Sequence, residues 1–204
     1  KRKNLPLPVQ TIYNGSAVLD FSNRDTLRED FRQRWNIPPD CRVIGTIGRL
    51  HPVKGQSYLI EAFKLLAKEF SDLHLLLIGE GPHHAQLQAL LAFYQLPSTM
   101  TGYLPDAWQA LPAMDLFVLP SLSEGMGLVL LEPAQAEIPI VASRVGGVPE
   151  LLTEHSEALL VSPADPLDLT LSCGRILKDK NLAKSLAVNA REKASRYTVE
   201  KMVQ

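Results

Sequence analysis

Two carboxylates, Glu124 and Glu132, stand eight residues apart in the sequence. Glu124 falls in a predicted loop after the apolar run 116–119, and Glu132 falls roughly two turns into the helix predicted to follow. On a fully helical path the two residues would be about 12 Å apart at most. That separation suits the two ends of one extended ligand better than a single metal ion or a pair that shares a proton. The alternative, that both are solvated surface residues, stays open on these two residues alone.

Two cations, Arg49 and Lys54, lie in the segment 48–55, which follows another apolar run at 43–47. If both apolar runs are parallel strands of one sheet, this segment meets Glu124 at the same edge, where helix N-termini favour phosphate charge. The order Lys-Gly-Gln is not that of a Walker phosphate loop, which needs Gly-Lys-Ser or Gly-Lys-Thr. Up to this point the two cations are explained as well by solvent exposure as by anion binding.

Glycines mark two more predicted strand ends. Gly79 and Gly81 supply two glycines of a dinucleotide fingerprint, but the third is absent and Pro82 follows, so we predict a tight turn. Gly146 and Gly147 follow the fifth predicted strand. Because they lack side chains, they would either let a ligand approach the backbone or form a plain turn.

The elements that must position these residues alternate between strand and helix. Six short apolar runs predict strands, at 43–47, 73–78, 98–102, 116–119, 139–142 and 158–161. Longer stretches between the strands predict helices at 55–70, 84–94 and 107–111 and after residue 127. After the last strand, two helices are predicted over 166–197, with a break between them near Asp179. Since a parallel crossover needs about a dozen residues, we predict an α/β fold, a doubly wound, Rossmann-like parallel sheet of about six strands with helices on both faces.

The first 40 residues do not follow this rhythm. One charged amphipathic helix is predicted from Arg24 to Trp35, and the remainder contains several prolines and reads as a linker. We therefore divide the chain into a lead-in, residues 1–40, and an α/β domain, residues 41–204. A chain that opens on such a segment is expected to be the second part of a longer protein.

Composition limits the classes of partner. The 204 residues are 46% hydrophobic, enough for a substantial core, and their net charge of −1 predicts no nucleic-acid partner. Cys41 and Cys173 are far apart and the five histidines form no ligand cluster, so neither a disulfide nor a metal site is predicted. A reducing cytoplasm is therefore the expected location. No window is apolar over the roughly 18 to 20 residues that a membrane span needs.

Five strand-end motifs occur in one order and spacing that is specific to a family. They are Gly48-Arg-Leu-x-x-x-Lys54-Gly55, Gly79-x-Gly81-Pro82, Pro120-Ser-x-x-Glu124-Gly-x-Gly127-Leu-x-x-Leu-Glu132, Pro139-Ile-Val-Ala142 and Gly146-Gly147-x-x-Glu150. Together they resemble the C-terminal, donor-binding domain of retaining glycosyltransferases of family 4, which have the GT-B fold. The resemblance covers roughly residues 9–200.

The resemblance implies a role for each matching residue. Arg49 and Lys54 would bind the diphosphate of a nucleotide sugar, Glu124 the transferred sugar and Glu132 the ribose hydroxyls; Arg49, Lys54 and Glu124 would be the catalytic set. The backbone of Gly125, Met126, Gly127 and Leu128 would cradle phosphate and sugar, with Tyr103 and Leu104 near the nucleobase. Cations and helix N–H groups can take the leaving diphosphate without a bound metal, and carboxylates suit hydroxyl-rich groups because they only accept hydrogen bonds.

By the same resemblance the parent protein would be a retaining, metal-independent enzyme of polysaccharide or glycolipid biosynthesis. It would transfer a sugar from a UDP-, GDP- or ADP-sugar donor to a sugar or lipid-linked acceptor, with no cofactor beyond that donor. The acceptor would be bound mainly by an N-terminal domain for which this chain leaves no room. That missing domain would also make any peripheral contact with the inner face of a membrane. The isolated chain would therefore be inactive.

Two alternatives belong to other classes. The parent could catalyse different GT-B chemistry, as a sugar-nucleotide epimerase or a phosphorylase, or the chain could be a non-enzymatic nucleotide-binding module. The sequence also departs from the family, which usually has Ala where Pro133 stands and Gly where Glu137 stands. Because proline lacks an N–H and crowds the carbonyl of Val129, we expect the helix that carries Glu132 to begin late or to kink.

Overall fold

The structure is a computed structural model that describes residues 14–199. Its apolar runs form one sheet of six strands, β1 Arg42–Ile47, β2 Leu73–Ile78, β3 Ser98–Met100, β4 Leu116–Leu119, β5 Ile140–Ser143 and β6 Leu159–Val161. Every neighbouring pair is parallel and the strand order is β3-β2-β1-β4-β5-β6. All six predicted strands and the doubly wound parallel sheet are confirmed.

The strands read as continuous apolar runs because both faces of the sheet are covered. In β4, Leu116 and Val118 pack into one core cluster, while Phe117 and Leu119 pack into the other, and all four are buried. Alternate residues of β2 divide between the two clusters in the same way.

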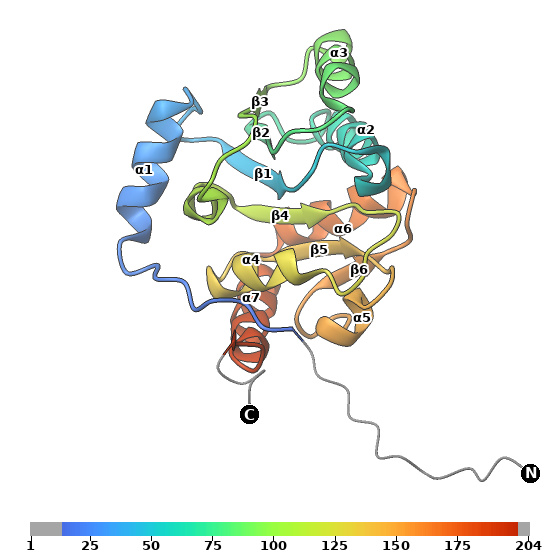
Figure 1. The fold of residues 1–204 in the computed structure, drawn as a ribbon. Helices are drawn as coiled ribbons and strands as arrows, with labels where there is room; N and C mark the ends of the chain where they lie inside the picture. The colour runs from blue at the N-terminus through green and yellow to red at the C-terminus, as the bar shows by residue number, and fades with distance from the viewer. Residues whose placement is uncertain (1–13, 200–204) are drawn as a thin grey trace, which may run out of the picture.

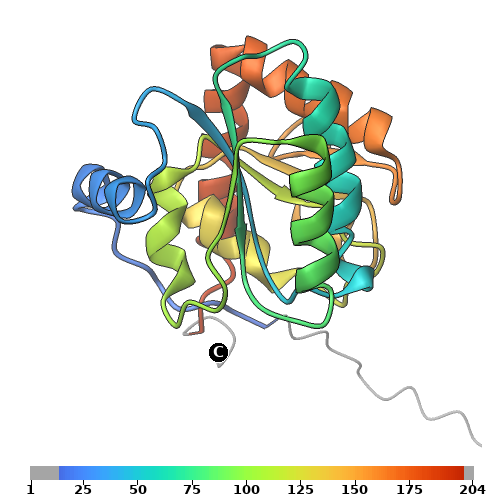
Figure 2. The same ribbon diagram turned by 90° about the horizontal axis from the view of Figure 1, so that it is seen from above.

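Helices form a layer on each face of the sheet. The longer helices are α1 Arg24–Arg34, α2 Gln56–Leu66, α3 His84–Tyr94, α6 Pro166–Lys178 and α7 Lys180–Ala194, and the short ones are α4 Leu131–Gln135 and α5 Val148–Leu151. Three 3-10 turns complete the chain, η1 Pro52–Lys54, η2 Ala107–Ala113 and η3 Leu128–Leu130. Helices α2, α3 and α6 pack on one face, and η2 and α4 on the other (Figures 1 and 2). Helix α7 contributes Leu186 to the first cluster and Ala190 and Ala194 to the second.

Aspartate caps set the helix boundaries near the C-terminus. Asp179 ends α6 and its carboxylate accepts hydrogen bonds from the N–H groups of Asn181 and Leu182, which start α7. The predicted break near Asp179 is confirmed. The helix predicted over 84–94 is also confirmed, whereas the one predicted over 55–70 spans only residues 56–66, and the four-residue α5 was not predicted.

The predicted lead-in helix is α1, which is fixed to the sheet through Arg32. This side chain is 5% exposed. Its guanidinium donates to four carbonyl oxygens and one carboxylate, those of Pro38, Pro39, Cys41, Ala113 and Asp115. Residues 1–13 of the lead-in lie outside the described residues. Within residues 14–199, no helix is long and apolar enough to cross a membrane.

Candidate functional site

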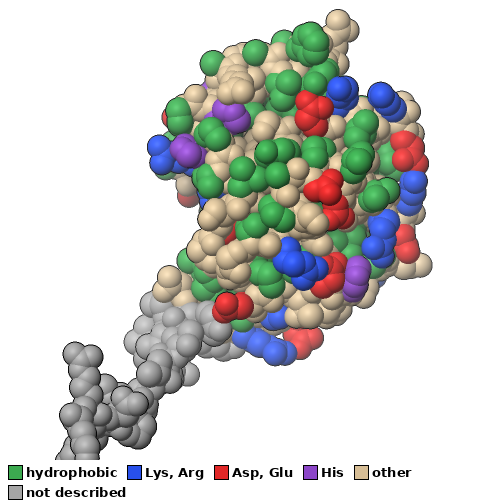
Figure 3. All heavy atoms as spheres, turned by 90° about the vertical axis from the view of Figure 1, so that its right-hand side faces the viewer, with side chains coloured by type: hydrophobic (Ala, Val, Ile, Leu, Met, Phe, Trp, Pro, Cys, Tyr) green, Lys and Arg blue, Asp and Glu red, His purple; other side chains and the backbone are tan. Residues whose placement is uncertain are grey.

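The predicted site residues gather where the strand order reverses. The chain steps outward from β1 to β2 and β3, returns to the other side of β1 at β4, and then continues to β5 and β6. The helices that follow β1 and β4 lie on opposite faces of the sheet, and the loops 48–55 and 120–127 lead into them from adjacent strand ends. In doubly wound sheets ligands bind at this switch point, outside the carboxyl ends of the strands. Those ends lie on the right-hand side of the sheet in Figure 1, the side that Figure 3 shows face on.

The two loops touch each other through their backbones. The N–H of Leu122 donates to the carbonyl oxygen of Val53 at 2.8 Å. Gly55 has a φ of 67°, and a Cβ atom placed on it would lie 1.9 Å from the carbonyl oxygen of Pro120. Only glycine fits this position, because both the left-handed backbone and the close approach exclude a side chain.

A cation and a carboxylate from the two loops meet at the switch point. The Nζ of Lys54 lies 2.7 Å from Oε1 of Glu124, and the Oγ of Ser121 donates to the same oxygen at 2.6 Å. The Glu124 side chain is 9% exposed and that of Lys54 29%. Ser121 is fully buried, and the sequence motif included it without assigning it a role. Lys54 closes the turn η1, which begins where the Nδ1 of His51 accepts the N–H of Val53.

Arg49 projects from the same loop into solvent. Its side chain is exposed and has no hydrogen-bond or ion-pair partner among residues 14–199. Its backbone is fixed by a hydrogen bond from the protein interior. The Nε2 of the buried Gln56 donates to the Arg49 carbonyl oxygen at 3.0 Å. The next residue, Leu50, donates its N–H to the carbonyl oxygen of Glu80 and accepts the N–H of His83, so the loop after β2 braces this one. Arg49 is therefore a free cation on a fixed backbone.

The glycine-bracketed segment 125–128 directly follows Glu124. Gly125 is exposed, and a Cβ there would meet no atom within 4 Å. Gly147 donates its N–H to the carbonyl oxygen of Gly125 at 2.6 Å, and a Cβ on Gly146 would lie 1.8 Å from the carbonyl oxygen of Glu124. The predicted turn at Gly146 and Gly147 is confirmed, and the absence of side chains there lets the loop after β4 pack closely against it.

Glu132 lies closer to the loop than predicted. One 3-10 turn, η3, follows Gly127, and Glu132 is then the second residue of α4 rather than two turns into a helix. Pro133 comes next, so the expected late helix start is confirmed. The carboxylate is half-buried, without a partner among the described residues, and this burial raises its pKa. An unpaired, desolvated acceptor is suited to hydroxyl donors of a ligand.

The other family departure, Glu137, is accommodated by an ion pair. Its φ of 52° is left-handed, a conformation that favours glycine. Its carboxylate contacts the guanidinium of Arg191 on α7.

The two predicted nucleobase contacts differ in exposure. Tyr103 is 67% exposed, whereas Leu104 packs against the core. They follow β3, which lies two strands from β1, or about 10 Å at the usual strand spacing. The structure therefore places Tyr103 and Leu104 after the edge strand β3, two strands away from the loop that carries Arg49 and Lys54.

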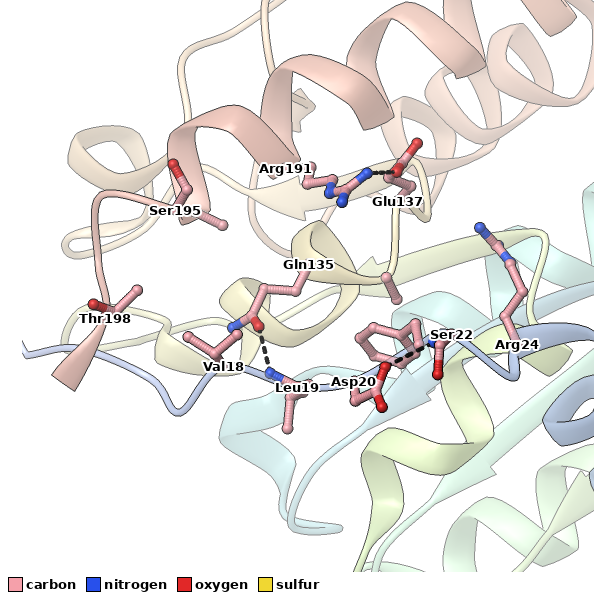
Figure 4. Close-up of a pocket in the computed structure, with 13 residues that line it drawn as sticks. Val18, Leu19, Asp20, Ser22, Arg24, Gln135, Glu137, Arg191, Ser195 and Thr198 are labelled. Carbon is pink, nitrogen blue, oxygen red and sulfur yellow. Dashed lines mark hydrogen bonds and ion pairs between the residues drawn. The ribbon is translucent and has the colours of Figure 1, made fainter. Parts of the chain in front are cut away.

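A cavity of about 620 Å³ lies away from these loops and contains none of the predicted site residues. Residues 18–22, α4 and α7 line it, as Figure 4 shows. Gln135 ties these parts together by accepting the N–H of Leu19 and donating to the carbonyl oxygen of Ala17. Within residues 14–199 no three His, Cys, Asp or Glu side chains are grouped to hold a metal ion.

Comparison with known proteins agrees with this geometry. The model of the family described as glycosyl transferases group 1 matches residues 28–193. The chain belongs to this family. Among the relatives of this group 1 chain, the sulfoquinovosyl transferase SQD2 of Arabidopsis thaliana is 30% identical over 167 residues, 79% of this chain and 32% of that protein. The D-inositol 3-phosphate glycosyltransferase of Corynebacterium urealyticum is 31% identical over 204 residues, 94% of this chain and 48% of that protein.

A solved structure from Anabaena, Alr3699/HepE in complex with UDP and glucose, has a TM-score of 0.84 and 25% identity to this group 1 chain. The match covers 95% of this chain and 54% of that one. The same Anabaena protein has been crystallised with UDP-glucose. The fold is thus that of one half of a GT-B glycosyltransferase, and the chain spans a third to a half of the curated relatives quoted.

Proposed function

We propose that this group 1 chain is the donor-binding part of a family 4 glycosyltransferase and that it binds a nucleotide diphospho-sugar over loops 48–55 and 120–127, at the carboxyl ends of the strands. The observation that carries the proposal is the 2.7 Å contact between Lys54 Nζ and Glu124 Oε1 at the switch point. One ligand with an anionic centre and a hydroxyl-rich end satisfies both groups. The Anabaena structural neighbour, crystallised with UDP and with UDP-glucose, supports this ligand class.

In the proposed arrangement the diphosphate lies over the loop after β1. Arg49 is exposed and unpaired among the described residues, and Lys54 lies five residues further along the same loop, so both can contact phosphate oxygens. Their positive charge stabilises the negative charge that develops on the leaving diphosphate. Transfer would then need no bound metal ion.

The carboxylates serve the two sugars of the donor. Glu124 borders the transferred sugar, and Glu132, in the first turn of α4, accepts hydrogen bonds from the ribose. Tyr103 and Leu104 reach the nucleobase from the loop after β3, roughly 10 Å away, which suits an extended ligand. The proposed donor carries uridine, guanosine or adenosine.

Acceptor binding is assigned to a part of the protein outside this chain, because the curated relatives quoted are two to three times longer. That part would bind a sugar or lipid-linked acceptor and would make any contact with the inner face of a membrane from the cytoplasm. The reaction is proposed to retain the anomeric configuration of the transferred sugar. Product analysis by NMR on a longer protein that carries this chain tests that stereochemistry.

Calorimetric titration of the chain tests the donor class. UDP, GDP and ADP, each alone and as its glucose or mannose conjugate, are titrated with and without EDTA. We expect one nucleotide to bind, its sugar conjugate to bind more tightly, and EDTA to leave both affinities unchanged. A sugar conjugate no tighter than its bare nucleotide would favour a simple nucleotide-binding module. Binding that EDTA abolishes would contradict metal independence.

A further inference from the structure

The Oε1 atom of Glu124 receives two hydrogen bonds of different character. Lys54 reaches it from another loop with a side chain that is 29% exposed. Ser121 reaches it from three residues earlier in the same loop, and Ser121 has no exposed surface. Both donors converge on one oxygen, and Oε2 of Glu124 has no partner among residues 14–199. The carboxylate is therefore oriented with one oxygen occupied and the other available.

The two donors respond differently to a phosphate-bearing ligand. In the proposed function Lys54 binds the diphosphate, so its ammonium group is shared with the ligand or leaves Glu124 altogether. The Ser121 side chain is buried, and among residues 14–199 its hydroxyl makes a hydrogen bond only to Glu124. Its bond to Oε1 does not depend on Lys54, and breaking that bond would leave a buried donor unpaired, which is costly.

The backbone around Glu124 does not depend on Ser121 for its position. Leu122 is bonded to Val53, Gly125 accepts the N–H of Gly147, and the Glu124 carbonyl rests against Gly146. What remains free without Ser121 is the rotamer of the Glu124 side chain. The hydroxyl therefore acts on the direction of the carboxylate rather than on the path of the loop.

We propose that Ser121 is a positioning residue that holds the Glu124 carboxylate toward the sugar of the donor, so that it sets the sugar-dependent part of donor affinity. The inference rests on the proposed function and deepens it. Removing the hydroxyl frees a carboxylate that must then be ordered when the sugar binds. The nucleotide part of the affinity, which depends on Arg49, Lys54 and Glu132, stays as it is.

The experiment compares wild type, Ser121→Ala and Ser121→Cys by calorimetry. Each protein is titrated with the nucleotide and the sugar conjugate that wild type binds best, and the ratio of the two dissociation constants gives the sugar-dependent gain. Ser172→Ala is the matched control, because Ser172 is also a buried serine but lies on α6. Thermal denaturation of all four proteins reports on folding.

We expect Ser121→Ala to lower the sugar-dependent gain about three- to tenfold, the range of one ordinary hydrogen bond. Its affinity for the bare nucleotide should match that of wild type and of Ser172→Ala. Cysteine is of similar size but a weak donor, so Ser121→Cys should behave like the alanine variant.

Two results would overturn the inference while leaving the proposed function intact. One is an unchanged gain in Ser121→Ala. The other is a full gain in Ser121→Cys, which would assign the effect to packing instead of hydrogen bonding. A wild-type chain that binds bare nucleotide but shows no sugar-dependent gain, or that binds no nucleotide, would overturn both the inference and the proposed function.

Discussion

The Nζ of Lys54 lies 2.7 Å from Oε1 of Glu124, although the two residues are 70 positions apart in the chain. The contact joins the loop after β1 to the loop after β4, the two strands between which the order of the sheet reverses. The fold alone explains the meeting, because β1 and β4 are adjacent and parallel and so end at the same edge.

A double-mutant cycle on Lys54→Met and Glu124→Gln should show a coupling energy of about 1 to 2 kcal/mol in urea denaturation. Solvent screens this contact little, because the Glu124 side chain is only 9% exposed. The control cycle uses Lys178 and Glu69, whose side chains are 58% and 52% exposed, and should give about 0 to 1 kcal/mol. Equal coupling in the two cycles would show that burial adds nothing at the site.

Glu132→Gln should stabilise the chain at pH 7. Burial raises the pKa of Glu132 in the folded state, so the folded protein disfavours the charged form more than the unfolded chain does. Wild-type stability is therefore lost as pH rises past the ordinary carboxyl value of 4.5, and the glutamine variant escapes that loss. Thermal midpoints at pH 3.5 and pH 7 check this. An advantage for the variant that is as large at pH 3.5 as at pH 7 would rule out ionisation as its cause.

Arg32→Ala should lower the free energy of unfolding by about 3 kcal/mol or more, because the carbonyl oxygens of Cys41 and Ala113 lose a donor and Asp115 loses one of its ion-pair partners. Arg28 is the comparison, since it also contacts Asp115 but its side chain is 33% exposed. Arg28→Ala should cost about 1 kcal/mol or less. Urea denaturation of both variants measures this, and similar losses would mean that α1 is not fixed mainly through Arg32.

The chain alone should transfer no sugar even where it binds donor. It spans about half of the D-inositol 3-phosphate glycosyltransferase that it resembles, and acceptor positioning is proposed to come from elsewhere. Lost positioning can remove about 7 to 11 kcal/mol of barrier lowering. Radiolabelled transfer by the chain is compared with that of a longer protein that carries it. Acceptor-dependent turnover within about a hundredfold would place the active site wholly inside these residues.

Local sequence patterns predicted the strands well and the loop contacts poorly. Each strand is a short apolar run bounded by turn residues. Such a run is typical of a strand whose two faces are both buried. The sequence predicted a late helix start but not that it would be at Leu131. Pro133 disfavours a regular helix through residue 129, but it does not determine which later residue begins the helix.

Contacts between loops carry no such local signal. Ser121 and Glu124 are three residues apart in a segment without periodicity, and nothing in their types states that the serine turns inward. Gly146 and Gly147 likewise predict a flexible turn, and only the structure shows that the loop after β4 fills the space that their side chains would take. Arg49 and Lys54 were placed at the correct edge because the strands were predicted to be parallel, and parallel strands end at the same edge of a sheet.

The most direct test of the proposed site is calorimetric titration of Arg49→Ala and Glu132→Ala with the nucleotide that wild type binds. Arg175→Ala is the control, since Arg175 is also exposed and has no side-chain partner among residues 14–199, but lies on α6. Loss of a charge-assisted contact should weaken binding by about 1.5 to 3 kcal/mol in each site variant and leave the control at wild-type affinity. Unchanged affinity in both site variants would contradict a donor site between the loops after β1 and β4.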